Sequence, residues 1–156
     1  MDCVLRVSGL TKSYQQVQAI RGLDLAVGRG EIFGLIGPDG AGKTSTFHIL
    51  SGVMPATSGQ VEVLGGSARQ ARERVGYLTQ AFSLYLDLSV RENLDYMGSM
   101  RGLSKTQIED RSRHYLSLFD MERFQDRLAG SLSGGMKQKL ALTASLLTIP
   151  ALLLLD

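Results

Sequence analysis

The sequence is short of the features that mark membrane-spanning and disulfide-stapled chains. Its longest unbroken apolar run is Ala151–Leu155, whereas a membrane helix needs about 20 apolar residues. The single cysteine, Cys3, excludes an internal disulfide and fits a reducing cytosol. Residues 1–10 include Asp2 and Arg6 and have no cationic start followed by an apolar block, so we expect no signal peptide.

An excess of charge of one sign is also missing. The 156 residues carry 17 Lys and Arg against 15 Asp and Glu, a formal charge of +2, and no basic arm or stripe stands out. Nucleic acid is therefore not expected as the main partner. A hydrophobic content of 44% with 21% charged residues indicates a globular chain, and its length suits about one domain.

The first half of the chain has the patterns of short strands and one helix. Apolar and polar residues alternate in two segments, and a continuous apolar run over Glu31–Gly37 is typical of a buried strand. A helix is expected over Lys43–Leu50, closed by Ser51 and Gly52. Strand, glycine-rich turn and helix in this order predict an α/β fold. The other expected strands are Val4–Val7, Leu23–Val27, Gln60–Leu64 and Val75–Thr79.

The second half favours helices. Ser89 with Glu92, and Ser104 with Gln107, have the form of capping boxes, and we expect residues 87–128 to be largely helical. A further helix is expected over Met136–Ile149, stopped by Pro150. The run Ala151–Leu155 predicts a buried strand that ends on Asp156. Because domains seldom finish on an interior strand, the sequence is expected to be a fragment.

One glycine-rich segment carries a chemical signature. Residues 37–44 fit the pattern G-x-x-x-x-G-K-[ST], with an apolar run before them and a helical pattern after them. Glycines let several amide groups converge on a phosphate, and the following helix points its positive end at the same anion. Lys43 adds a full positive charge, and the Thr44 hydroxyl is placed to bind Mg²⁺. The segment predicts a nucleoside triphosphate site.

A second motif gives a resemblance to a known family. Residues 131–138, Ser-Leu-Ser-Gly-Gly-Met-Lys-Gln, resemble the signature motif of ATP-binding-cassette (ABC) ATPases. Gln80, Tyr14 and Leu152–Asp156 resemble that family's Q-loop glutamine, adenine-stacking aromatic and Walker B strand with its aspartate. The resemblance covers the whole chain. It implies an α/β P-loop NTPase with an ABC-type core sheet and an inserted α-helical subdomain, whose C-terminal part is missing beyond the Walker B aspartate.

The resemblance assigns roles to single residues. It implies that Lys43 and Gln80 are catalytic, and that Thr44, Gln80 and Asp156 surround Mg²⁺, partly through water. Ser133, Gly134 and Gly135 would grip the γ-phosphate of ATP held by another subunit. The implied nucleotide-binding residues are Tyr14, Gly37, Pro38, Asp39, Gly40, Ala41, Gly42, Lys43, Thr44 and Ser45.

Each of the weaker assignments has a plainer alternative. Tyr14 alone also fits a packing residue, and Gln80 alone fits a solvated strand end. Ser133 also fits a plain helix N-cap, although a cap does not need two glycines after it. Asp156 also fits a frayed terminal residue. We expect His48 and His114 to be surface or packing residues.

The sequence also departs from the family pattern. Met136 stands where the signature most often has Gln, and Asp39 puts a carboxylate near the phosphates, which should weaken binding slightly. The family's catalytic glutamate after the Walker B aspartate, its D-loop and its switch histidine are not in this sequence. The fragment is therefore expected to bind nucleotide better than it hydrolyses it.

The resemblance implies the ATP-binding subunit of a membrane transporter. Such a subunit is cytoplasmic and peripheral on the inner face of the plasma membrane, pairs with a second nucleotide-binding domain, and drives a separate permease, here of the ABC-2 exporter type. Ala81–Glu92 would dock the permease's coupling helix. The implied division is a RecA-like core of residues 1–86 and 146–156 and a helical subdomain of residues 87–145.

Two other interpretations stay open. The first is a soluble ABC ATPase that acts on ribosomes or DNA, although the helical insert is too short for the coiled coil of repair-type cassettes. The second is a non-catalytic, truncated nucleotide-binding remnant.

Overall fold

The computed structural model describes residues 3–80 and 83–156. The chain forms two compact units. We call residues 1–75 together with Asp156 the N-terminal unit, and residues 76–155 the helical unit.

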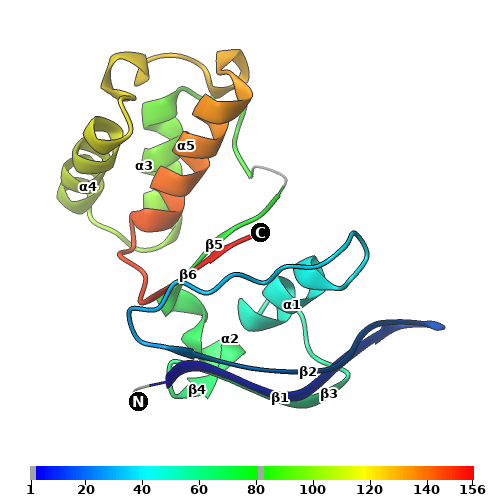
Figure 1. Cartoon of the computed structure of the whole chain (residues 1–156). Coiled ribbons are helices and arrows are strands. Elements are labelled where there is room, and N and C mark those ends of the chain that lie inside the picture. Colours follow the sequence, from blue (N-terminus) through cyan, green and yellow to red (C-terminus); the bar gives the residue numbers. More distant parts are fainter. Residues whose placement is uncertain (1–2, 81–82) are drawn as a thin grey trace. The chain divides into compact units, whose positions relative to one another are not determined.

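The N-terminal unit is built on an antiparallel sheet with strand order β2-β1-β3-β4. Strands β1, β2 and β3 run alongside one another in Figure 1. The hairpin between β1 and β2 turns at Gln15, whose φ of 52° is left-handed. Leu5 and Val7 of β1 are buried and Arg6 between them is exposed, so alternation marks the inner face there, and a register shift before Leu10 brings that residue back to the inside. The bounds are β1 Cys3–Tyr14, β2 Val17–Gly28, β3 Ser58–Val63 and β4 Gly66–Ser67.

Helix α1, Lys43–Leu50, begins where the sequence predicts. It buries Thr46, Ile49 and Leu50, and the Thr46 hydroxyl donates to the carbonyl of Gly42 at 2.9 Å. The helix ends at Ser51, followed by Gly52 in the left-handed conformation that closes many helices. Helix α2, Ala68–Ala71, and the 3₁₀ turn η1, Arg72–Arg74, lead out of the sheet.

The buried strand predicted over Glu31–Gly37 is wrong. The segment is not part of any ladder, and Ile32 and Ile36 are 101% and 95% exposed. An apolar run becomes a buried strand only where a neighbouring strand accepts its hydrogen bonds and a second layer covers its face. No strand in residues 3–80 and 83–156 pairs with this segment.

The helical unit combines a small sheet with three helices. Strands β5, Val75–Leu78, and β6, Leu152–Leu155, pair with each other. Helices α3, α4 and α5 lie side by side in Figure 1. Their bounds, with those of the two 3₁₀ turns, are α3 Val90–Met100, α4 Lys105–Leu118, η2 Glu122–Phe124, η3 Ala129–Ser131 and α5 Gly134–Leu146.

Capping residues mark where helices of this unit begin. The predicted boxes form at Ser89 with Glu92 and at Ser104 with Gln107, each serine accepting from the third residue of its helix. The predicted helical stretch 87–128 is broken after α3, where Gly102 takes a left-handed φ of 74°. The last helix starts at Gly134 instead of Met136 and ends at Leu146, before the predicted end at Ile149. The buried core between the helices consists of Val90, Leu94, Leu116, Met121, Ala129, Leu132, Leu140 and Leu147.

Candidate functional site

The glycine-rich loop 37–44 forms a tight turn against β2. Gly40 and Gly42 have φ of 79° and 87°, and the amide of Ala41 donates to the carbonyl of Pro38 at 3.2 Å. A Cβ atom on Gly42 would lie 2.4 Å from the carbonyl oxygen of Ala19. Only glycine therefore fits position 42, where left-handed backbone and close approach coincide.

The loop presents a positive helix end. Gly42 is the N-cap of α1, and the first turn of the helix has neither a side-chain cap nor an acidic residue. Helix N-terminal amides carry partial positive charge and bind anions. The Lys43 ammonium curls back over the loop and donates to the carbonyls of Gly37 and Pro38, each at 2.8 Å. The Lys43 ammonium and the uncapped start of α1 therefore lie at the same loop, a combination that suits a phosphate.

Two oxygen-bearing side chains meet beside this loop. The Thr44 hydroxyl donates to a carboxylate oxygen of Asp156 at 3.0 Å, and both residues belong to the N-terminal unit. Hydroxyl and carboxylate oxygens suit Mg²⁺, which proteins usually hold through one or two carboxylates plus substrate phosphates. The described residues contain no cluster of three or more His, Cys, Asp or Glu that would hold a metal alone. The pair fits a magnesium ion shared with a nucleotide.

Tyr14 stands at the end of β1, next to α1. The residue is 41% exposed, and its hydroxyl lies 3.1 Å from the Ser45 hydroxyl and donates to the Met54 sulfur at 2.9 Å. The Lys12 ammonium lies 5.2 Å from the ring centroid and also donates to the carbonyl of Pro55. The structure therefore brings Tyr14 to the phosphate-loop helix, 31 residues further along the chain.

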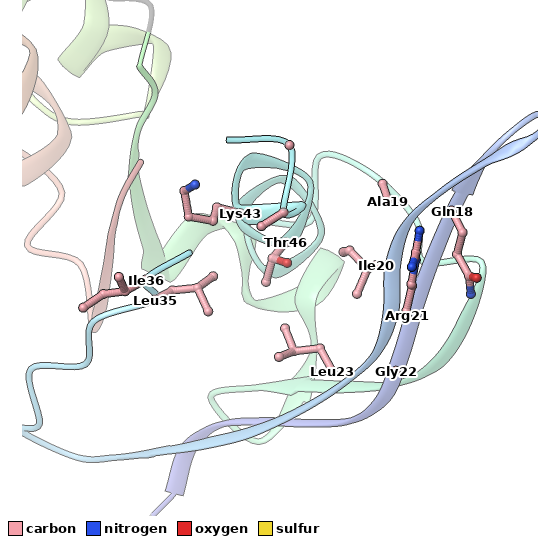
Figure 2. Close-up of a pocket in the computed structure, with 12 residues that line it drawn as sticks. Gln18, Ala19, Ile20, Arg21, Gly22, Leu23, Leu35, Ile36, Lys43 and Thr46 are labelled. Atoms are coloured by element: carbon pink, nitrogen blue, oxygen red, sulfur yellow. The ribbon is translucent and has the colours of Figure 1, made fainter. Parts of the chain in front are cut away.

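A cavity of about 450 Å³ borders the loop on the side of β2. Figure 2 shows Ile20 and Leu23 of β2 and Leu35 around it, with Thr46 and Lys43 on the side of α1. Its walls are mainly aliphatic. Arg21, Lys43 and the phosphate-loop residues Gly40 and Ala41 also line it, so the cavity adjoins the loop.

The signature residues lie in the helical unit, at the start of α5. Ser133 is the N-cap, and its hydroxyl accepts from the amide of Met136 at 3.3 Å. Ser133, Gly134 and Gly135 are all exposed. A Cβ atom on either glycine would meet nothing within 4 Å, and neither has a left-handed φ. Local packing therefore does not require these glycines, although the serine does cap the helix.

The other residues singled out in the sequence lie in both units. Gln80 is exposed, two residues after the end of β5, and belongs to the helical unit. Asp39 is exposed near the tip of the phosphate loop. His48 is half-buried in the last turn of α1, and His114 is exposed on α4 with its ring edge-on to Tyr115. Residues 81–82, at the start of the predicted docking segment, lie outside the described residues.

Sequence reasoning missed Asn93, which organises the loop ahead of α3. Its side chain is 0% exposed. It accepts from the amide of Tyr85 at 2.9 Å and donates to the carbonyls of Tyr85, Leu88 and Ser89. A single buried carboxamide therefore shapes residues 85–89. The only signal in the sequence is an asparagine directly after the capping-box glutamate, which does not by itself predict such a contact.

The loop that Asn93 shapes exposes aromatic and aliphatic side chains. The rings of Tyr85 and Tyr96 meet edge to face, with centroids 4.8 Å apart. The hydrogen bond between the Tyr85 and Tyr96 side chains, which favours the neutral Tyr85 phenol, raises the pKa of Tyr85 above its usual value. Leu86, next to Tyr85, is also exposed. This group forms an apolar surface on the segment that was predicted to dock a partner.

The folded phosphate loop, opening a helix within an α/β chain, defines a P-loop nucleotide-binding domain. The sequence profile of the ABC transporter family matches residues 20–156, and the chain belongs to that family.

Curated relatives agree with this assignment. The chain is 38% identical to the probable multidrug ABC transporter ATP-binding protein YbhF of Escherichia coli, over 99% of the chain and 28% of that protein. It is 33% identical to the linearmycin resistance ATP-binding protein LnrL of Bacillus subtilis, over 98% of the chain and 50% of that protein. It therefore spans half the length of these relatives or less.

Solved structures give the same fold. An ATP-binding subunit of an ABC transporter superimposes with a TM-score of 0.87 at 29% identity, covering 98% of this chain and 65% of that one. The cbiO1 protein of Clostridium perfringens, part of the ABC transporter complex cbiONQ, gives 0.86 at 25% identity, covering 100% and 66%. No helix in the described residues is both long and apolar enough to cross a bilayer.

Proposed function

We propose that this chain is the nucleotide-binding part of the ATP-binding subunit of an ABC transporter. It binds MgATP, and the complete domain hydrolyses it to drive transport through a separate permease. The observation that carries the proposal is the convergence of Lys43, the first turn of α1 and the Thr44–Asp156 pair at 3.0 Å.

The chain's residues divide the work of holding the nucleotide. The amides of residues 37–44 and the Lys43 ammonium bind the β- and γ-phosphates, Ser45 donates its hydroxyl to the phosphates, and Tyr14 stacks on adenine. Thr44 and Asp156 hold Mg²⁺, with Gln80 as a further ligand and as the residue that orients the attacking water. When bound, Mg²⁺ supplies charge neutralisation on the phosphates.

The signature residues complete the site of a second copy of the domain. Ser133, Gly134 and Gly135 present exposed amides at the N-terminus of α5, where an anion is favoured. Bare glycines that local packing does not require are suited to close approach of a phosphate from another subunit. We therefore propose that two domains sandwich the nucleotide head to tail.

Transport is favoured over the ribosome-acting alternative because YbhF and LnrL are both ATP-binding proteins named for multidrug transport or drug resistance. We propose export as the direction, with the subunit in the cytoplasm at the inner face of the plasma membrane. Its permease would bind the apolar surface at Tyr85 and Leu86, within the predicted docking segment. The core of residues 1–86 and 146–156, with a helical subdomain of residues 87–145, is part of the same proposal.

The proposal is tested by Lys43→Ala. Removing the ammonium that meets the phosphates is expected to weaken MgATP binding by at least about tenfold, measured by calorimetry. Lys105→Ala is the matched control, because it removes the same charge from an exposed helix position, where the lysine lies 3.9 Å from Glu109. Unchanged binding in the Lys43→Ala variant would refute the nucleotide site.

A further inference from the structure

The hydroxyl of Tyr14 takes part in a chain of hydrogen bonds that reaches the phosphate-loop helix. It donates to the sulfur of Met54 at 2.9 Å and lies 3.1 Å from the Ser45 hydroxyl. A phenol has one proton. When that proton is given to the sulfur, the bond to Ser45 is donated by Ser45, and the order is Ser45 to Tyr14 to Met54.

Ser45 lies at the positive end of α1. It is the third residue of the helix, directly after Lys43 and Thr44, in a first turn that has no side-chain cap and no acidic residue. In that order its hydroxyl proton is given to Tyr14. A phosphate oxygen in the loop would compete with Tyr14 for that single proton.

Both Tyr14 and the phosphate can be bonded to Ser45 if the phenol proton changes its acceptor. A thioether sulfur is a weak acceptor, so the phenol proton can leave Met54 at little cost and turn to the Ser45 oxygen. Ser45 then accepts from Tyr14 and donates its own proton to the phosphate. Hydrogen bonds in such a chain polarise one another, and a bond to a charged acceptor is stronger than a neutral one.

We propose that the Tyr14 hydroxyl, and not only its ring, is a positioning group for the phosphate end of the site. By donating to Ser45 it aims the serine proton at the triphosphate. The inference rests on the proposed nucleotide site and adds a role that stacking on adenine does not include. The ring itself is held by the Lys12 ammonium, 5.2 Å from its centroid, so the hydroxyl stays near Ser45.

The test uses a ligand without a base. Tyr14→Phe keeps the ring and removes only the hydroxyl, and magnesium tripolyphosphate has nothing for the ring to stack on. Calorimetry is expected to show tripolyphosphate binding about three- to tenfold weaker in Tyr14→Phe, the change that one net hydrogen bond gives. In a Ser45→Ala background the same substitution is expected to change binding less than about twofold.

Further variants exclude a loss of fold as the cause. Tyr115→Phe removes a tyrosine hydroxyl from α4 and is expected to bind like wild type. Met54→Leu keeps the volume but removes the competing sulfur, so its affinity is expected to equal or exceed that of wild type. Weaker binding by Met54→Leu would contradict the relay.

The outcomes separate this inference from the function on which it rests. If Lys43→Ala loses tripolyphosphate binding but Tyr14→Phe keeps it, the relay is wrong and the nucleotide site stands. The relay is equally wrong if Tyr14→Phe costs the same with and without Ser45. If Lys43→Ala itself binds tripolyphosphate normally, the proposed site fails.

Discussion

At the scale of single residues, the chain contains glycines of two kinds. Gly42 is required by its own surroundings, since its φ of 87° is left-handed and its missing Cβ makes room for the backbone of β2. Gly134 and Gly135 have ordinary backbone angles and open space around them. The first glycine shapes the loop, whereas local structure does not explain the other two, which leave room for a group that approaches from outside the unit.

Gly42→Ala tests the first kind, with Gly30→Ala as its control. Gly30 has a φ of 74°, but a Cβ atom there would meet nothing within 4 Å, so alanine adds only backbone strain, about 1–2 kcal/mol. Gly42→Ala adds a clash with the carbonyl of Ala19 and is expected to cost about 3 kcal/mol or more. Urea unfolding measures both. Equal losses would show that the close approach to β2 has no energetic weight.

At the scale of elements, helix starts are the best-determined features. The capping boxes of α3 and α4 join residues only three apart, so their formation depends little on the rest of the fold. In α3 the Glu92 carboxylate accepts from the amide of Ser89 at 2.8 Å, and this backbone hydrogen bond, with one to the Ser89 side chain, lowers the pKa of Glu92. The stability of the helix start is therefore linked to pH.

Glu92→Gln tests that link. A carboxyl whose pKa is lower in the folded state than its unfolded value near 4.5 stabilises the fold above that value, and the contribution is lost as the pH falls through the folded pKa. Glutamine can still accept the bond but does not titrate. Urea unfolding is expected to show that wild type is more stable than the Glu92→Gln variant near neutral pH. At about pH 3.5 the difference in urea midpoint between the two proteins is expected to be smaller. The same difference in urea midpoint between the two proteins at both pH values would contradict this linkage.

At the scale of the whole molecule, the described surface includes exposed apolar side chains in the segment 32–36. Ile32 and Ile36 are almost fully exposed, and Phe33 between them is partly so. Apolar side chains in an extended segment without a strand partner favour association with another chain. Exposed residues of this kind contribute little to folding stability but strongly to solubility.

The double substitution Ile32→Thr and Ile36→Thr is expected to change the free energy of unfolding by less than about 1 kcal/mol, because both side chains are already in water. The same change should lower self-association, seen as reduced light scattering over a range of concentrations. Ile49→Thr, at a position 3% exposed, is the buried control and is expected to cost about 2 kcal/mol or more. A large loss of stability in the double variant would mean that the segment is buried in solution.

Most elements were predictable because their signals are local. The phosphate loop with α1, the two capping boxes and the strand before Asp156 all appear where the sequence indicates them. The prediction for Glu31–Gly37 was wrong because a strand also depends on contacts that are not local. Its apolar composition describes a preference for burial, whereas a ladder also needs a partner strand, which composition does not specify.

The sequence by itself determined the family, through its motifs, and the starts of α1, α3 and α4, because each motif and each cap depends on residues close together in the chain. Tertiary structure alone decided which distant groups meet: Thr44 with Asp156 across 112 residues, and Tyr14 with Ser45 across 31. It also decided that Asn93 is a buried hub. Contacts of this kind follow from how packed surfaces bring backbone segments together, and a linear pattern carries no record of that geometry.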